Sequence, residues 1–317
     1  MQPDVSVVIP TYNREEYLRQ AIASCFEGNE EVDVEVVVVD DGSTDGTREY
    51  LEELDDDHVR PVFQEHQGGQ VARNRGLSEV RGEYLKFLDD DDWLAPSALR
   101  WEVKALQRTG ADVCVGTYQS VDNRGNLNRT LSDEPPDDFI AGVLRGTVTP
   151  HPLHLTYRRK IIDSLRWDPD VIGRQDLQFL VEVALQEPSF VHLGEIVGYR
   201  RLHEGEHQSE RAARATDLSR VHASLLLRAV KRLRRENWLT SERRNAAVES
   251  LWTWAHVLSA YDWPAFGEMY EEICEVQADF RPEREHWLLT AIDQLVTPRM
   301  TEGVLYPFRK TKHLLWK

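Results

Sequence analysis

The strongest pattern in the sequence is an alternation of apolar and amphipathic segments across roughly the first 90 residues. Short β-branched or apolar runs predict buried strands, and the first three of them are each followed by a segment with helical periodicity. The predicted strands cover residues 5–10, 34–40, 59–64 and 82–88. This alternation predicts βαβ units and therefore an α/β fold, with a mostly parallel open sheet flanked by helices.

The second part of the chain is less regular. We expect a strand at 111–121, a polar loop at 122–138, a strand running into a helix at 151–162, and a helix at 173–185. After about residue 205 the segments are helical and carry no strand signal, which predicts a helical appendage packed on the α/β domain. We therefore expect an α/β domain at 1–205, with halves at 1–112 and 113–205, and a helical region at 206–317.

Composition narrows the choice of partners and compartment. The net charge of −17 excludes nucleic acid as an expected partner, because phosphate backbones require a basic surface. Only seven of the 38 basic residues are lysines, a bias that points to a high-salt cytoplasm.

No apolar run approaches the length of a membrane span and no secretory leader is recognisable, so we expect a cytoplasmic protein. Cys25, Cys114 and Cys274 stand apart and are expected to be free thiols.

Four consecutive aspartates, Asp89 to Asp92, end the fourth predicted strand. In an open α/β sheet, ligands bind beyond the carboxyl ends of the strands, so this run should meet the loops "PTYNR" (10–14) and "DDGS" (40–43). An acidic pocket that accepts a phosphorylated ligand needs a divalent cation between the two. The alternative is that the aspartates are ordinary acidic surface of an acidic protein.

Six segments in this order resemble the family 2 glycosyltransferases, which are inverting enzymes with the GT-A nucleotide-sugar-binding fold. They are "VSVVIPTYNR", "VVVVDDGSTDGT", "GGQVARNRGL", "GEYLKFLDDDDW", "YRRKII" before "RQDLQFL", and "YRRLHEGEHQS". The resemblance covers roughly residues 4–205. It implies a nucleotide-sugar donor and transfer to an acceptor hydroxyl.

The resemblance also assigns the aspartates. Asp89, Asp90 and Asp91 occupy the family's Asp-x-Asp motif, with Asp91 at the metal-binding position and Asp89 on the ribose and metal side. The implied cofactor is Mg²⁺ or Mn²⁺, which neutralises the charge that develops on the departing diphosphate. Asp92 either joins this site or caps the following helix.

Other positions follow from the same resemblance. Pro10 and Thr11 match the loop that touches the nucleotide, and Arg73 matches a position beside the diphosphate. Asp41 matches the carboxylate that accepts the imide hydrogen of the base, which favours UDP. The alternative for Asp41 is a purely structural turn with Ser43.

Asp176 matches the family's general base, although Gln175 replaces the glutamate that usually precedes it. We expect the helix dipole to keep the pKa of Asp176 low, and a plain helix cap is the alternative role. His203 matches a loop histidine that approaches the metal, while His151 and His154 are expected on the acceptor side.

Three other functions compete with sugar transfer. A sugar nucleotidyltransferase would carry a glycine-rich loop after the first strand, where "IPTYNRE" has none, and a phosphoacceptor receiver domain would be shorter. An inactive nucleotide-sugar-binding module remains open. For the acceptor we expect a glycan or lipid-linked glycan of the cell surface or of protein N-glycosylation. The basic segments 228–236 and 305–317 are either contacts to an anionic membrane or ordinary solvated faces.

Overall fold

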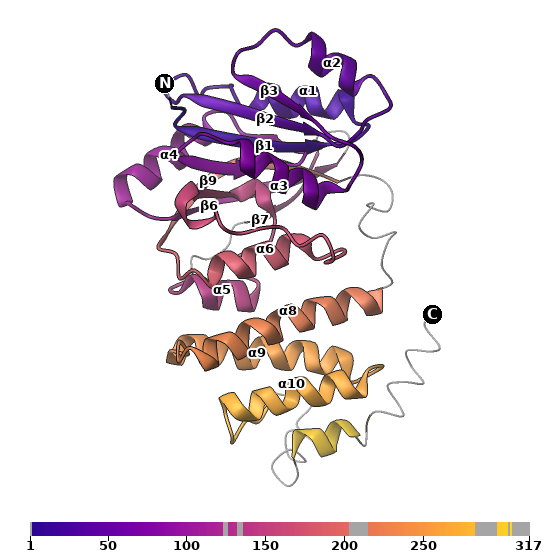
Figure 1. Ribbon diagram of the computed structural model, residues 1–317. Helices are drawn as coiled ribbons and strands as arrows, with labels where there is room; N and C mark the ends of the chain where they lie inside the picture. Colours follow the sequence, from indigo (N-terminus) through magenta and orange to yellow (C-terminus); the bar gives the residue numbers. More distant parts are fainter. Residues whose placement is uncertain are drawn as a thin grey trace.

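The computed structural model describes residues 2–122, 126–131, 136–202, 215–282, 297–303 and 305 (Figure 1). Its strands are β1 (Val5–Thr11), β2 (Val34–Asp40), β3 (Val59–Phe63), β4 (Tyr84–Phe87), β5 (Trp93–Leu94), β6 (Val113–Asp122), β7 (Leu127–Leu131), β8 (Leu155–Arg158) and β9 (Phe190–Leu202). Its α-helices are α1 (Glu15–Ser24), α2 (Thr47–Glu53), α3 (Gly69–Glu79), α4 (Ala98–Thr109), α5 (Phe139–Arg145), α6 (Gln175–Ala184), α8 (Ala215–Arg235), α9 (Ser241–Leu258) and α10 (Trp263–Val276).

The strands form one sheet in the order β3-β2-β1-β4-β8-β6-β9-β5, with β7 paired to β6. β1 runs parallel to both β2 and β4, and β2 runs parallel to β3. Every residue of β1 and β2 is buried, because helices cover both faces of a parallel sheet and leave no solvated side. The predicted α/β fold with a mostly parallel sheet is therefore confirmed.

The later strands make the sheet mixed. β8 runs antiparallel to both β4 and β6, while β6 and β9 are parallel. The predicted polar loop at 122–138 is partly wrong, because β7 pairs with β6 at the edge of the sheet. Its residues 127–130 are exposed, so burial imposes no alternating pattern that the sequence could reveal. The helix predicted after β8 is only a 3₁₀ turn, Arg159–Ile161.

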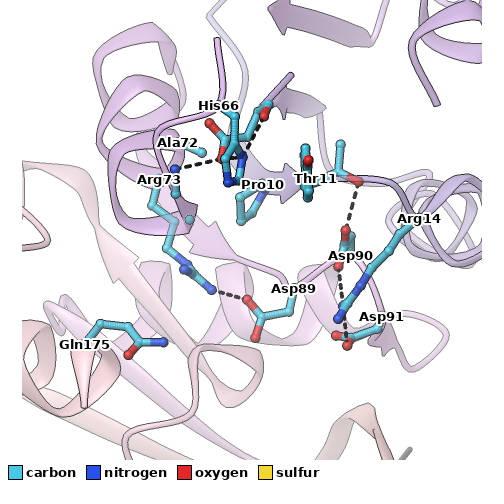
Figure 2. A pocket seen from close by; sticks show the side chains of 14 residues that line it. Pro10, Thr11, Arg14, His66, Ala72, Arg73, Asp89, Asp90, Asp91 and Gln175 are labelled. Carbon is cyan, nitrogen blue, oxygen red and sulfur yellow. Dashed lines mark hydrogen bonds and ion pairs between the residues drawn. The ribbon is translucent and has the colours of Figure 1, made fainter. Parts of the chain in front are cut away.

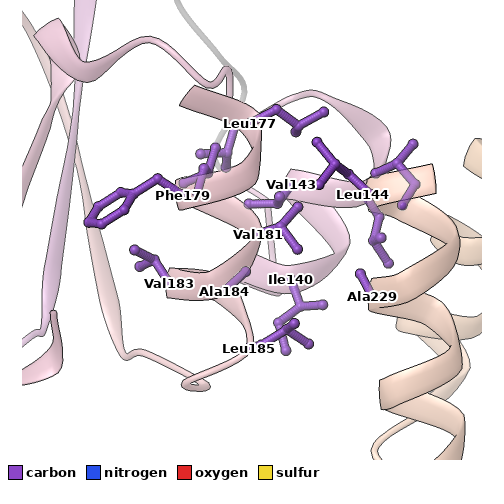
Figure 3. Packing of buried hydrophobic residues seen from close by; sticks show 14 of the residues in the cluster. Ile140, Val143, Leu144, Leu177, Phe179, Val181, Val183, Ala184, Leu185 and Ala229 are labelled. Carbon is purple, nitrogen blue, oxygen red and sulfur yellow. The ribbon is translucent and has the colours of Figure 1, made fainter. Parts of the chain in front are cut away.

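The helices after residue 214 pack on α5 and α6 rather than on the sheet itself. Figure 1 shows α8, α9 and α10 stacked beyond α5 and α6, as the sequence predicts for this region. One hydrophobic cluster runs from the sheet residue Val115 through α6 to Leu233 and Leu251. Figure 3 shows the middle of this cluster, where side chains of α5 and α6 meet Ala229 of α8. The helix that begins with Gln175 is therefore held from both sides.

Two further expectations concern single residues and membranes. Cys25 and Cys114 are buried, Cys274 is half-buried, and all three are free thiols. Within the described ranges, no helix is both long and apolar enough to cross a bilayer.

Candidate active site

A cavity of about 370 Å³ opens where β1, β2 and β4 end (Figure 2). We call it the strand-end cavity. Parallel strands expose their carboxyl ends at one edge of the sheet, so the loops that follow them meet there. All six residues predicted to bind the nucleotide sugar line it: Pro10, Thr11, Asp41, Arg73, Asp89 and Asp90. The six come from four separate segments of the chain.

A second cavity of about 330 Å³ adjoins the first and shares Arg73, Asp89, Asp91 and Gln175 with it. We call it the acceptor-side cavity, after the expectation from the sequence that His151, which lines it, lies on the acceptor side. Asp176 lines it from the first turn of α6, so Asp91 and Asp176 face the same space. The remaining predicted site residue, His203, lies outside the described residues.

Two arginines neutralise the Asp-x-Asp carboxylates. Arg14 lies 2.9 Å from Asp90 and 2.5 Å from Asp91, and Arg73 forms an ion pair with Asp89. Burial and the neighbouring Asp91 raise the pKa of Asp90 to about 7, although Arg14 opposes this change. Burial also disfavours the charge on Asp89, but Arg73 holds the pKa of that carboxyl below its ordinary value. The aspartates are therefore built into the site and are not loose acidic surface.

Asp41 organises the loop that follows β3. Its Oδ1 accepts hydrogen bonds from Gln64 Nε2 at 2.6 Å and from the Gln67 amide at 2.9 Å. Its Oδ2 accepts one from the Gly68 amide at 2.8 Å and lies 2.9 Å from His66 Nδ1. Four partners surround this buried carboxylate, so a base that binds to it must replace one of them.

Asp92 belongs to the site and does not cap the next helix. The following helix, α4, begins at Ala98, whereas Asp92 Oδ1 accepts a hydrogen bond from the Arg201 amide at 3.0 Å. Its Oδ2 lies 3.6 Å from His151 Nε2 and accepts no hydrogen bond from any described residue. Asp92 thus links the end of β4 to β9 through Oδ1, while its Oδ2 faces His151.

Asp89, Asp92 and His151 could hold a metal ion. One ligand atom from each lies within 4.8 Å of the others. Burial lowers the pKa of His151 to about 4, so its imidazole is neutral and competent as a ligand. Two carboxylates with one imidazole suit a hard or borderline divalent ion. Asp91 lines the same cavity but is not a member of this group.

The environment of Asp176 differs from the sequence prediction. Its Oδ1 is buried without a hydrogen-bond partner among the described residues. Burial, aided by the charge of Asp89, raises the pKa of Asp176 to about 7, even though Arg73 and Arg200 favour the ionised form. The predicted low pKa is wrong, because loss of solvent outweighs the helix dipole. A carboxyl with this pKa can gain or lose a proton near neutrality.

Two neighbouring arginines have different environments. The guanidinium of Arg201 stacks over Tyr17 and Trp93, at 4.8 Å and 4.7 Å from the ring centroids, and its Nη2 donates to Gln20. Arg200 lines the acceptor-side cavity, and its guanidinium forms no hydrogen bond or ion pair with a described residue. The side chain of Arg201 is therefore held in place by its neighbours, whereas the guanidinium of Arg200 is available to bind an anionic ligand.

Several lining residues were not selected from the sequence. Tyr12 stacks on His66 with ring centroids 4.2 Å apart, and both line the strand-end cavity. Loop position alone could have suggested them, as it could have suggested Arg14. His151 lines the acceptor-side cavity, whereas His154 is fully buried against Tyr118 and lines neither cavity.

The sequence matches the family model described as glycosyl transferase family 2 over residues 6–166, which is half of the chain. The chain belongs to this family. Among solved structures of the GT-A fold, it is similar to residues 1–349 of TarS from S. aureus in complex with UDP-GlcNAc, with a TM-score of 0.72 and 20% identity over 99% of this chain and 92% of that one. A mannosyltransferase from Pyrobaculum calidifontis, in complex with GDP-Man and Mn²⁺, gives a TM-score of 0.53 at 19% identity, over 100% and 88% of the two chains.

Curated relatives match between 37% and 55% of this chain. A Campylobacter jejuni enzyme named GalNAc(5)-diNAcBac-PP-undecaprenol beta-1,3-glucosyltransferase is 34% identical over 55% of this chain and 57% of its own length. The succinoglycan biosynthesis protein ExoO of Rhizobium meliloti is 35% identical over 41% of this chain and 38% of its own length. The chain spans about half the length of such curated relatives or less.

Proposed function

We propose that this family 2 protein is a metal-dependent inverting glycosyltransferase. It moves a sugar from a nucleoside diphosphate sugar, with UDP favoured, to the hydroxyl of an acceptor glycan. The observation that carries the proposal is that Asp91 and Asp176 line one cavity, directly joined to the cavity formed by the strand ends. A donor that lies across both would place its diphosphate near the Asp-x-Asp motif and its sugar near Asp176.

The donor half of the proposal has independent support. The strand-end cavity brings together the six residues predicted to bind the nucleotide sugar. The TarS structure and the Pyrobaculum structure contain UDP-GlcNAc and GDP-Man, so nucleotide sugars occupy two proteins of this fold. UDP is favoured over GDP here through Asp41, provided that the base replaces one of its present partners.

The residues around Asp89 fit a divalent ion. We propose that Asp89 and Asp91 hold Mg²⁺ or Mn²⁺, with Asp92 and His151 available to complete the ligand set and His203 as a further candidate. When bound, the ion supplies positive charge to the diphosphate that leaves with the nucleotide. Arg14 and Arg73 supply part of that charge from the chain itself, and Arg200 can pair with a phosphate oxygen.

Asp176 is proposed as the general base. Its carboxylate accepts the proton of the acceptor hydroxyl while that oxygen attacks the anomeric carbon, and the bond to the diphosphate breaks on the opposite face of the sugar. Only the ionised carboxylate can accept this proton. With a pKa of about 7, a substantial fraction of Asp176 is ionised near neutral pH.

We place the acceptor among cell-surface or protein-linked glycans built on a lipid carrier, in the cytoplasm or at the cytoplasmic face of the membrane. The name of the Campylobacter relative includes an undecaprenyl-linked glycan, and that of the Rhizobium relative includes succinoglycan. In this scheme, 1–112 forms the nucleotide-sugar half and 113–205 the acceptor half. The helical region at 206–317 would serve the acceptor.

The test is transfer activity with a panel of nucleotide sugars, measured by mass spectrometry with Mn²⁺, with Mg²⁺ and with a chelator. We expect turnover of at least one donor with metal, and a loss of about a hundredfold or more in Asp91→Asn. Asp57→Asn is the matched control, because Asp57 is an exposed member of another acidic run. Donor binding without any turnover would instead identify an inactive nucleotide-sugar-binding module.

A further inference from the structure

Outside the two cavities of the active site, the helical region contains two hollows on α9. The Trp254 hollow, of about 500 Å³, is bordered by α5, α6, α8 and α9 and includes Leu177, His222 and Trp254. The Trp252 hollow, of about 390 Å³, includes Trp252, Gln277 and Phe280. Both volumes fall in the range of about 300–1,000 Å³ that is usual for small-molecule sites.

The Trp254 hollow and the acceptor-side cavity take part of their lining from the same two helices. Asp176 lines the cavity and the next residue of α6, Leu177, lines the hollow. On α8, Leu218 lines the cavity and His222, one turn further along, lines the hollow. The same two helices, α6 and α8, therefore border both spaces.

The two hollows are also joined to each other. Glu249 and Thr253 line both, so they form a ridge on α9 with one hollow on either side. Thr253 is exposed on this ridge, and its hydroxyl donates to the Glu249 carbonyl at 2.9 Å. The two hollows therefore share lining residues with each other, whereas the acceptor-side cavity and the Trp254 hollow are lined by neighbouring residues of α6 and α8.

The chemistry of the lining suits sugar rings. In the Trp254 hollow, the indole stacks on His222 at 3.9 Å between ring centroids, and His222 Nδ1 is buried without a partner among the described residues. Apolar side chains such as Val148 and Leu177 are combined with the polar groups of Arg145 and Glu249, which pair at 2.6 Å. A sugar ring presents C–H faces to aromatic and apolar groups and hydroxyls to polar ones, whereas a lipid tail would leave the buried His222 Nδ1 without a partner.

In the Trp252 hollow, Trp252 and Phe280 lie 5.4 Å apart between centroids, beside Asn245 and Gln277. Planar amides next to aromatic rings again offer both kinds of contact that a sugar ring needs. The two hollows thus repeat one pattern of an aromatic surface with polar neighbours.

We propose that an acceptor glycan of several sugars lies along this track, with its reactive end at Asp176, its next sugars in the Trp254 hollow and its far end in the Trp252 hollow. The inference rests on the proposed transferase function and adds to it the site that recognises the acceptor. A monosaccharide acceptor would reach only the acceptor-side cavity. Longer acceptors gain contacts with α8 and α9.

The first experiment measures binding of the labelled full-length protein to an array of immobilised oligosaccharides that includes single sugars and longer chains. We expect the protein to bind particular longer oligosaccharides, and Trp254→Ala to weaken this binding by about tenfold or more, as for tryptophan anchors in other binding sites. Thr253→Met adds bulk on the exposed ridge without touching the core, and we expect a similar loss. Trp254→Phe keeps an aromatic surface and should lose about threefold or less.

Trp238→Ala is the matched control, because it removes a half-buried indole of the same region that lines neither hollow. It should bind glycans like the unmodified protein. Unchanged binding in both Trp254→Ala and Thr253→Met would overturn the inference, as would failure of the unmodified protein to bind any oligosaccharide. Trp254-dependent binding to vesicles containing polyprenyl phosphate, without oligosaccharide binding, would also overturn it in favour of a lipid.

The second experiment separates this inference from the proposed function. Hydrolysis of the nucleotide sugar by water requires the donor site but no acceptor, so Trp254→Ala should hydrolyse donors at the unmodified rate. If the protein hydrolyses donors but Trp254→Ala does not change glycan binding, the proposed glycan-binding track is wrong and the proposed transferase function is retained. If Trp254→Ala weakens glycan binding but the protein turns over no donor, the proposed glycan-binding track is retained and the proposed transferase function is wrong.

Discussion

The active-site cavities and the helical region are held together by different kinds of contact. Around the cavities, short polar bonds join loops that are far apart in sequence, such as Thr11 to Asp90 at 2.8 Å and Asn13 to the Thr44 amide at 2.7 Å. In the helical region, apolar side chains such as Leu233 and Leu251 are fully buried. Substitutions in the first region should therefore change chemistry, and substitutions in the second should change stability.

The largest effect is expected from Asp176→Asn. The amide keeps the shape of the side chain but cannot accept the proton, so transfer should fall by about 10²- to 10⁴-fold. The melting temperature should stay the same or rise, because an unpartnered buried carboxyl is replaced by a neutral group. Unfolding of this variant, rather than a loss of activity in the folded protein, would contradict the view that substitutions around the cavities change chemistry and not stability.

Leu233→Ala tests the other side of the comparison. Leu233 is fully buried on α8, and its truncation should lower the free energy of unfolding by about 2–5 kcal/mol. Chemical denaturation measures this loss, and donor hydrolysis per folded molecule should remain unchanged. An equal loss of hydrolysis in the folded fraction would show that the helical region also shapes the donor site.

A smaller effect is expected on membrane contact. Ser224, Arg228, Arg232 and Arg235 line a groove of about 680 Å³ on α8 that also contains Lys231 and Arg234. Acidic neighbours already offset part of this charge, since Arg232 lies 3.8 Å from Glu182 and Arg235 lies 2.9 Å from Glu236. If the groove rests on anionic lipid, each reversed charge should cost about 1 kcal/mol or more of binding.

The measurement is co-sedimentation of Arg232→Glu/Arg235→Glu with anionic vesicles, with neutral vesicles as the control. We expect the variant to lose most of its sedimentation, whereas the fold and donor hydrolysis are unchanged. Equal sedimentation of variant and unmodified protein would make the basic face an ordinary solvated surface.

The smallest effect is a dependence on pH. The pKa of Asp176 is raised to about 7, so the fraction of ionised base, and with it the turnover number, should rise as the pH increases through about 7. The pKa of Asp90 is also raised to about 7, so donor affinity must be measured by calorimetry across the same range. A turnover number that is flat across this range would contradict the assignment of the base.

The sequence predicts the first half of the fold well because its strands are buried on both faces. A run such as 34–40 has one interpretation when followed by a turn and an amphipathic helix. It fails for β7, whose exposed residues carry no burial pattern. It predicts the strand β8 but not its antiparallel direction, which depends on partners far along the chain. Pairing direction is a property of the assembled sheet, which no local pattern records.

The sequence also predicts that the site residues lie close together, because the loops that follow parallel strands meet at one edge of the sheet. The sequence does not reveal their contacts. Nothing local shows that Asp41 is surrounded by the residues after β3, or that Asp92 faces His151. Nor does it show that solvent exclusion raises the pKa of Asp176. The roles of these residues stay predictions until the variants are measured.

The cluster that runs from Val115 through α6 to Leu251 has a practical consequence for protein engineering. A fragment that stopped after β9 would leave the outer side of α5 and α6 bare, including Leu144 and Leu185, and would invite aggregation. We therefore expect that the part of the chain up to β9 does not form a stable domain without α8 and α9. Grafts that seek a new acceptor should exchange side chains along α9 and leave the apolar seam between α6 and α8 intact.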